Sequence, residues 1–346
     1  MPLVSVIIPS YQSADALPNA LDSVQRQTFT DLEVIVVDDG STDDTRAVVE
    51  AASAADPRIR YLYQENQGPA VARNTGIAAA EGEYIALLDA DDTWEPEKLA
   101  GQVAILDGHP EIGLVFTDSV NINMVDGQRF RFSEHYANAL EQLTLTPLDD
   151  LPDAYRLEGN FRHILFSRNF IHTSSVVMRK AVVEEVGGFN PACFGTEDIV
   201  LWLRLIRVTR FGYWRHVCTT RTKTESSLSL FSERRLLAIK ALYDMYLASP
   251  EDADLHPMIR RKMRKLHRQM ARLYGRTGAP RRAIRVFVDS LPFGFDTRTA
   301  AFAAASLLGP LPFAVGRRLS QLANTLLLPI GQRAIENGSS NNQPST

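Results

Sequence analysis

Short apolar runs alternate with amphipathic stretches along the first 117 residues, and this alternation limits the fold more than any other feature. The apolar runs predict strands, and the stretches between them predict helices. The expected strands are residues 4–8, 32–37, 59–63, 84–88 and 112–117. The expected helices are residues 15–27, 42–52, 69–80 and 95–106. This order is typical of a doubly wound α/β sheet, in which ligands bind beyond the carboxyl ends of the strands.

The rest of the chain is less regular. Residues 119–170 contain few periodic runs, and we expect an irregular excursion over the ligand site. A strand at 174–178, a short helix at 181–186 ended by two glycines, and a helix at 198–208 are expected to follow. From about residue 230 the sequence becomes rich in Arg, Lys, Leu and Ala. We therefore expect an α/β domain at residues 1–229, a helical region at 230–336 and a disordered polar tail at 337–346.

The net charge of −4 conceals an uneven distribution. Residues 1–229 hold 19 Lys and Arg against 33 Asp and Glu, whereas residues 230–346 hold 18 against 8. An acidic first part suits metal binding, and a basic second part suits an anionic partner such as a membrane leaflet or another protein. Only Cys193 and Cys218 are present, and the N-terminus has no basic leader. We expect a cytoplasmic protein without a disulfide framework and without a nucleic-acid partner.

Acidic residues follow the fourth expected strand directly, in the run Asp89-Ala90-Asp91-Asp92. If the strand continues, Asp89 and Asp91 point the same way, because alternate residues of a strand share a face. Two carboxylates at a sheet edge make an oxygen site for Mg²⁺ or Mn²⁺, and such ions commonly accompany phosphate-bearing substrates. The alternative is an acidic loop that caps the next helix.

Three more positions near the expected strand ends suit a nucleotide. The Gly-x-Gly-x-x-Gly fingerprint is absent after the first strand, which disfavours a nicotinamide-dependent dehydrogenase. Tyr11 can stack on a nucleobase, and Asp39 can accept a hydrogen bond from a base N–H; an exposed loop aromatic and a helix cap are the alternatives. Arg73 lies one turn inside a helix that a glycine precedes, where it can reach a diphosphate. A surface salt bridge is the alternative for Arg73.

Taken in order, the motifs resemble those of the family 2 glycosyltransferases, which have the GT-A fold. The resemblance covers roughly residues 3–229 and implies that fold for the first domain, a doubly wound and mostly parallel mixed sheet. The matching segments are residues 4–11 (VSVIIPSY), 36–43 (VVDDGSTD), 72–76 (ARNTG), 87–92 (LLDADD), 187–189 (GGF) and 197–204 (EDIVLWLR).

The resemblance implies roles for four residues in binding the donor. Pro9, Tyr11 and Asp39 would hold the base of a nucleotide-sugar, which is expected to be UDP-linked. Arg73 would lie near the base and the phosphates.

The resemblance also implies the groups that surround the reacting atoms. Asp89 would hold the ribose or the water shell of the metal, and Asp91 would ligate Mn²⁺ or Mg²⁺. Asp198 would be the general base for the acceptor hydroxyl, and Glu197 would place the acceptor or orient its neighbour. An acidic pair at the start of a helix is also a common cap, which is the alternative for Glu197 and Asp198.

One segment departs from the resemblance. Many relatives have a histidine after the last sheet element, where it can ligate the metal, and this chain offers Lys223 at that place. A protonated lysine cannot ligate a metal but can contact the diphosphate directly, so we expect weaker metal affinity. We expect His172 and His216 to be structural or surface residues.

The C-terminal region suggests a contact with a membrane. Residues 258–274 predict a basic amphipathic helix. Residues 299–316 are uncharged, but Gly309, Pro310 and Pro312 interrupt them, which favours an interfacial segment over a membrane span. Residues 258–336 are therefore a candidate contact with the anionic inner face of the cell membrane. A soluble helical appendage is the alternative.

The expected function is inverting transfer of a sugar from a nucleotide-sugar to a hydroxyl of a glycan or lipid-linked glycan, as in cell-surface polysaccharide synthesis. A sugar nucleotidyltransferase is one alternative, although the first loop lacks a basic, glycine-rich signature for triphosphates. A non-catalytic subunit that binds nucleotide-sugars at a membrane is the other.

Overall fold

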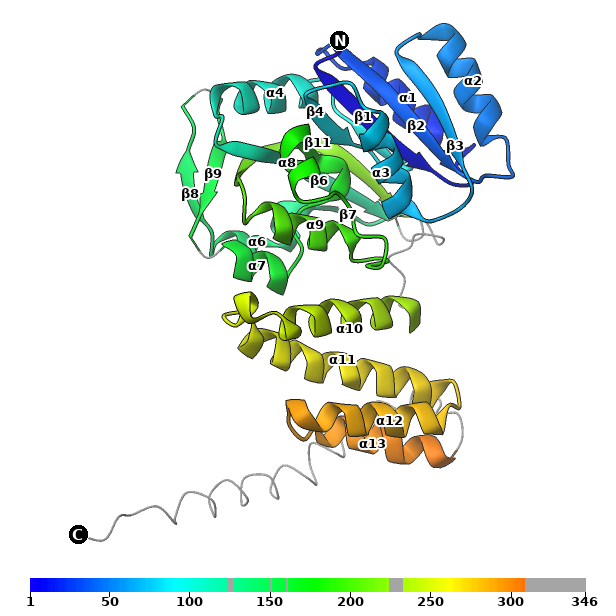
Figure 1. The fold of residues 1–346 in the computed structure, drawn as a ribbon, viewed down its shortest axis with the longest axis vertical. Helices are drawn as coiled ribbons and strands as arrows, with labels where there is room; N and C mark the ends of the chain where they lie inside the picture. Colours follow the sequence, from blue (N-terminus) through cyan, green and yellow to red (C-terminus); the bar gives the residue numbers. More distant parts are fainter. Residues whose placement is uncertain (124–126, 150, 160, 224–232, 309–346) are drawn as a thin grey trace, which may run out of the picture. The chain divides into compact units, whose positions relative to one another are not determined.

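The structure, a computed structural model, describes residues 1–123, 127–149, 151–159, 161–223 and 233–308. The chain divides into two compact units, Met1–Leu230 and Phe231–Thr346 (Figure 1). A mixed sheet forms the centre of the first unit, and helices build the described part of the second.

The strands of the first unit form one sheet. Its main path has the order β3-β2-β1-β4-β10-β6-β11-β9-β8, while β5 pairs with β11 and β7 with β6. Pairs among the first four strands of this path are parallel, and β10 is antiparallel to both of its neighbours. The expected mixed, mostly parallel sheet is confirmed. The strands are β1 (Val4–Ser10), β2 (Leu32–Asp39), β3 (Ile59–Gln64), β4 (Tyr84–Leu87), β5 (Asp92–Trp94), β6 (Ile112–Asn123), β7 (Arg129–Arg131), β8 (Thr144–Pro147), β9 (Ala154–Glu158), β10 (Val176–Arg179) and β11 (Arg210–Lys223).

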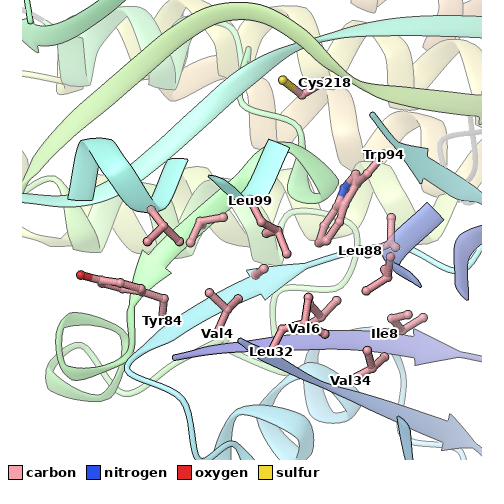
Figure 2. Packing of buried hydrophobic residues seen from close by; sticks show 14 of the residues in the cluster. Val4, Val6, Ile8, Leu32, Val34, Tyr84, Leu88, Trp94, Leu99 and Cys218 are labelled. Atoms are coloured by element: carbon pink, nitrogen blue, oxygen red, sulfur yellow. The ribbon is translucent and has the colours of Figure 1, made fainter. Parts of the chain in front are cut away.

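Helices cover both faces of this sheet. Val4, Val6 and Ile8 of β1 belong to one core cluster with Leu21 of α1 and Leu99 of α4 (Figure 2). The α-helices of the first unit are α1 (Leu17–Gln25), α2 (Thr45–Ala55), α3 (Pro69–Ala79), α4 (Lys98–Gly108), α5 (Phe132–His135), α6 (Ala137–Leu140), α7 (Phe161–Ser167), α8 (Lys180–Glu185) and α9 (Glu197–Leu205).

A glycine lets α3 lie close against the other face of the sheet. A Cβ on Gly76 would come within 2.4 Å of Ile7 Cγ2 and 3.3 Å of Val37 Cγ2. Because Ile7 alternates with Val6 and Ile8 along β1, its side chain points to the opposite face. This close packing brings the start of α3 to the carboxyl end of the strands, next to the acidic turn formed by residues 89–92.

The expectation of an irregular excursion at residues 119–170 is wrong in part. β6 continues to Asn123, and β7, β8 and β9 all join the sheet. The sequence conceals these strands for two physical reasons. Thr117, Ser119 and Asn121 of β6 are polar although buried, so the apolar run stops before the strand does. The other three strands have only three to five residues, too few to establish a period.

The described part of the second unit, residues 233–308, contains four α-helices: α10 (Glu233–Ala248), α11 (His256–Arg276), α12 (Pro280–Ser290) and α13 (Thr297–Ala305). α11 buries Ile259, Met263, Leu266 and Met270 at helical spacing, and its other face is basic, as the pattern at residues 258–274 predicts. None of the helices in the described ranges is long and apolar enough to cross a membrane. Of the expected interfacial segment at 299–316, residues 299–308 belong to α13 and the short turn η4 (Ser306–Leu308), and residues 309–316 lie outside the described residues, as does the tail at 337–346.

Candidate active site

Asp39 ends β2 and organises the loop that leads into α3. Its buried carboxylate accepts hydrogen bonds from the side chain of Gln64 at 2.7 Å and from the backbone N–H groups of Gln67 and Gly68 at 2.9 and 2.8 Å. Pro9 is half-buried in β1, and Tyr11 follows β1 with 53% of its surface exposed. The three expected base-binding residues therefore lie at the ends of two adjacent strands.

The acidic turn after β4 does not continue as a strand. β4 ends at Leu87, and the N–H of Asp92 closes a turn on the carbonyl oxygen of Asp89. As a result Asp92 is buried and Asp91 is exposed. The expectation that strand alternation sets Asp89 and Asp91 on one face is wrong, because the backbone turns between them.

The side chain of Ser174 stabilises this turn through two hydrogen bonds. Its hydroxyl accepts the backbone N–H of Asp89 at 3.0 Å and donates to Asp92 Oδ2 at 2.6 Å. The other oxygen of Asp92 accepts the N–H of Thr222 at 3.2 Å. Asp92 therefore stabilises the turn through its hydrogen bonds, a role that its position in the sequence did not reveal.

Asp89, Asp92 and His172 form a group that can hold a metal ion. One potential ligand atom of each lies within 4.8 Å of the others, and His172 Nε2 is 3.4 Å from Asp92 Oδ2. His172 is buried, so the expectation of a surface residue is wrong and that of a structural one stays open. Although Asp91 is exposed, neighbouring atoms partly desolvate its carboxylate, and this desolvation, followed by repulsion from Asp89, raises the pKa of Asp91 to about 6. A bound cation would relieve this repulsion between carboxylates, so the donor set fits a divalent ion.

Arg73 connects the acidic turn to the start of α9. Its guanidinium donates to Asp89 Oδ1 at 2.7 Å and to Glu197 Oε1 at 3.4 Å, and it lies 5.3 Å from the ring centre of Phe189. Burial disfavours ionisation of Asp89, but the charge and hydrogen bond of Arg73, with smaller contributions from His172 and Arg221, together outweigh it and hold the pKa of Asp89 below its ordinary value. Arg73 is buried, so the surface salt bridge considered for it is wrong.

Asp198 lies beside Glu197 in the first turn of α9. Its Oδ2 accepts a hydrogen bond from Asn169 at 2.7 Å, and its Oδ1 accepts its neighbour Ile199 N–H at 2.7 Å. Burial, followed by repulsion from Glu197, raises the pKa of Asp198 to about 6. A carboxylate with a pKa near neutrality is suited to accept a proton.

The Gly187-Gly188-Phe189 segment is tied to α3 by Asn74. The Asn74 side chain accepts the N–H of Phe189 at 2.9 Å and donates to the carbonyl of Phe189 at 2.8 Å. Both glycines have positive φ and end α8, as expected. This contact fixes Phe189 beside Arg73.

The remaining candidates are less informative. Lys223 is the last residue of β11 and pairs with Asn123, but its side chain lies outside the described part of the structure. His216 is exposed and stacks on Trp214 with ring centres 4.9 Å apart, as expected of a surface histidine.

Comparison with known protein families shows which family the chain belongs to. The family model described as glycosyl transferase family 2 matches residues 5–186, more than half of the chain. The chain belongs to glycosyltransferase family 2. This membership disfavours nucleotidyl transfer.

Two curated relatives of this family 2 glycosyltransferase have names from polysaccharide biosynthesis. The succinoglycan biosynthesis protein ExoO of Rhizobium meliloti is 36% identical over 186 residues, which are 53% of this chain and 52% of ExoO. The putative teichuronic acid biosynthesis glycosyltransferase TuaG of Bacillus subtilis is 44% identical over 106 residues, 30% of this chain and 42% of TuaG. The chain thus spans about half or less of these relatives.

Solved structures show the same fold. S. aureus TarS (residues 1–349) in complex with UDP-GlcNAc superposes with a TM-score of 0.56 at 19% identity, over 87% of this chain and 83% of TarS. The mannosyltransferase PcManGT from Pyrobaculum calidifontis, in complex with GDP-Man and Mn²⁺, has a TM-score of 0.51 at 20% identity, over 99% of this chain and 88% of that one. The family 2 glycosyltransferase has the GT-A fold.

Proposed function

We propose that the protein is an inverting, metal-dependent glycosyltransferase that moves a sugar from a UDP-linked donor to a hydroxyl of a glycan or lipid-linked glycan. The observation that supports it most is the pair of acidic groups joined through Arg73. Asp89 lies on one side of the guanidinium, and Glu197 with its neighbour Asp198 lies on the other. Relatives in polysaccharide biosynthesis and fold neighbours that bind UDP-GlcNAc or GDP-Man agree with this proposal.

The proposed reaction is a single displacement at the anomeric carbon. Asp198 accepts the proton of the acceptor hydroxyl, and the hydroxyl oxygen forms the new bond to carbon. The bond from that carbon to the diphosphate oxygen breaks, and its electron pair leaves with the nucleoside diphosphate. Attack from the face opposite the leaving group inverts the configuration. General-base assistance of this kind contributes about 10² to 10⁴ in rate.

A divalent cation, Mn²⁺ or Mg²⁺, would offset the charge of the leaving diphosphate as a Lewis acid. We propose Asp91 and Asp89 as its ligands, because Asp91 is exposed and Asp92 already accepts hydrogen bonds from Ser174 and Thr222. Ligation by Asp92 and His172 is the alternative. Pro9, Tyr11 and Asp39 would hold the base, and Lys223 would contact the diphosphate.

Three variants test the assignments. A thermal-shift screen of nucleotide-sugars with Mn²⁺ first identifies the donor. With that donor, we expect Asp198→Asn to abolish transfer and to retain donor binding. We expect Asp91→Ala to weaken Mn²⁺-dependent binding of UDP, measured by calorimetry, whereas His172→Ala should weaken it more if the alternative ligand set is correct. Full transfer activity in Asp198→Asn would refute the base assignment.

We propose, further, that the second unit contacts the anionic inner face of the membrane, which would place the protein in the cytoplasm as a peripheral protein. Ile284, Val288 and Leu291 are exposed at helical spacing along α12 and the turn that follows it. Exposed Arg281 and Arg285 flank this apolar stripe. Apolar side chains beside basic ones are typical of helices that lie in a membrane interface.

Vesicle sedimentation tests this contact. We expect the protein to sediment with phosphatidylglycerol vesicles and not with phosphatidylcholine vesicles. Replacement of Ile284 and Val288 by Ser should release it, whereas the same change at exposed Val208 of the first unit should not. Equal binding to both vesicle types, or no effect of the double variant, would contradict the proposal.

A further inference from the structure

Asn169 lies between α7 and the turn η1 (Thr173–Ser175) and contacts Asp198 directly. Its Nδ2 donates to Asp198 Oδ2 at 2.7 Å, and its Oδ1 accepts the N–H of Ile171 at 3.2 Å. These two partners fix the orientation of the amide. The reverse orientation would set its oxygen against a carboxylate and its NH₂ group against an N–H. The donor of Asn169 therefore faces Asp198.

The backbone beside Asn169 is anchored in the core. Phe170 is buried between Phe116 and Phe161, with ring centres 6.1 and 5.6 Å away. Ile171 is buried as well. Since the two residues that follow Asn169 are packed in the core, Asn169 has little freedom, and its amide is held in place before any substrate binds.

Both carboxylate oxygens of Asp198 thus accept a hydrogen bond. Asn169 donates to Oδ2 from one side, and Ile199 N–H donates to Oδ1 from the same helix as Asp198. Each carboxylate oxygen has two lone pairs, so both retain one that can accept a proton or a further hydrogen bond. Two fixed donors determine the plane of the carboxylate and hence the direction of those lone pairs.

We propose that Asn169 is a positioning residue that holds Asp198 in the orientation and ionised form in which it takes a proton from the acceptor. This inference rests on the proposed role of Asp198 as general base. The charged groups that act on Asp198 are Glu197, its neighbour on α9, which disfavours ionisation, and Arg73 from α3, which favours it. Asn169 favours the ionised form without adding a charge, because an amide N–H bonds more strongly to a carboxylate than to a carboxylic acid.

The titration of Asp198 can be measured without a substrate. In protein labelled with ¹³C at the aspartate carboxyl, the Asp198 signal is identified as the one that Asp198→Asn lacks. We expect its titration midpoint to rise by about one pH unit in Asn169→Ala. In Asn169→Asp, a second carboxylate replaces the hydrogen-bond donor. The two carboxylates at positions 169 and 198 should then titrate in two steps, and the higher midpoint should lie above that of the alanine variant.

Controls separate this role from a structural one. Asn19 is exposed on α1, and Asn19→Ala should leave the Asp198 midpoint unchanged. If Asn169 only supports the fold, Asn169→Ala will lower the melting temperature and leave the midpoint where it is, which would overturn the inference. Calorimetric binding of UDP with Mn²⁺ should not change in Asn169→Ala, and its loss would also contradict a role confined to the base.

The result that would refute the proposed function differs from the result that would refute the role of Asn169. Full transfer by Asp198→Asn would refute the general base whatever the titration shows. An inactive Asp198→Asn with an unshifted midpoint in Asn169→Ala would refute only the role of Asn169.

Discussion

Lys98 is fully buried at the start of α4, and its removal should stabilise the first unit. Within the described residues, its Nζ has no hydrogen-bond partner. Burial lowers the pKa of Lys98 from 10.5 to about 7. The Cys218 thiol nearby offers no counter-charge, since burial raises the pKa of that thiol to about 12. An uncompensated buried ammonium is costly, so Lys98→Met should be more stable than the natural protein at neutral pH.

The magnitude and its pH dependence follow from proton linkage. Between pH 7 and 10.5 the unfolded chain keeps a proton on Lys98 that the folded state releases. The free energy of unfolding of the natural protein therefore rises with pH in this window by up to about 1.4 kcal/mol per pH unit. The full penalty, present below pH 7, is on the order of 5 kcal/mol by this calculation. Attraction to the Trp94 ring, whose centre is 3.9 Å from Nζ, offsets up to about 2 kcal/mol.

Urea denaturation followed by tryptophan fluorescence measures the effect. Trp94, Trp202 and Trp214 all belong to Met1–Leu230, so the signal reports on the first unit alone. We expect Lys98→Met to gain roughly 3 to 5 kcal/mol at pH 7 and progressively less toward pH 10. Lys180→Met, which removes a lysine bonded to the carbonyl of Ala80, controls for the change in net charge. An advantage of Lys98→Met that is the same at pH 7 and pH 10 would refute the reasoning.

Three other predictions concern the supports of the site. Gly188→Ala should lose more stability than Gly187→Ala. Both glycines have positive φ, and an alanine held in that conformation costs about 1–2 kcal/mol, but only at Gly188 would the new Cβ also lie 2.7 Å from Asn74 Oδ1. Equal losses of the free energy of unfolding in urea denaturation would contradict this prediction. Asp39→Asn should lose about 2–3 kcal/mol, because an amide cannot accept from all three donors that meet there; an unchanged midpoint would be inconsistent with these contacts. Ser174→Ala should weaken Mn²⁺-dependent UDP binding, since the turn that holds Asp89 and Asp92 loses its shared hydroxyl; unchanged calorimetry would show that the turn is stable without it.

The sequence predicts the first half of the sheet well and the site only in outline. Apolar runs and helical spacing locate the elements from β1 to α4 except the short strand β5, because both signals are local. The acidic turn shows the limit of local reasoning. Strand alternation pairs Asp89 with Asp91, but the turn at Ala90 buries Asp92 instead. No local pattern signals such a reversal.

Contacts between distant segments are the part that the sequence does not reveal. His172 follows Asp92 by 80 residues and Asn169 precedes Asp198 by 29, and each pair meets only because the sheet brings the segments together. Arg73 was expected beside phosphates from its place at a helix start, yet it lies between two carboxylates supplied by later segments. Only a buried arginine's need for counter-charges hints at that arrangement.

The place of β10 in the sheet has a consequence for folding. β10 lies between β4 and β6, although it follows both in the sequence. Until residues 176–179 arrive, β4 and β6 each keep an unpaired edge toward the position that β10 will fill, and such edges are prone to association between chains. Non-local pairings of this kind also slow folding. The segment that fills this position also brings Ser174 to the acidic turn, so we expect assembly of the central sheet and assembly of that turn to be coupled during folding.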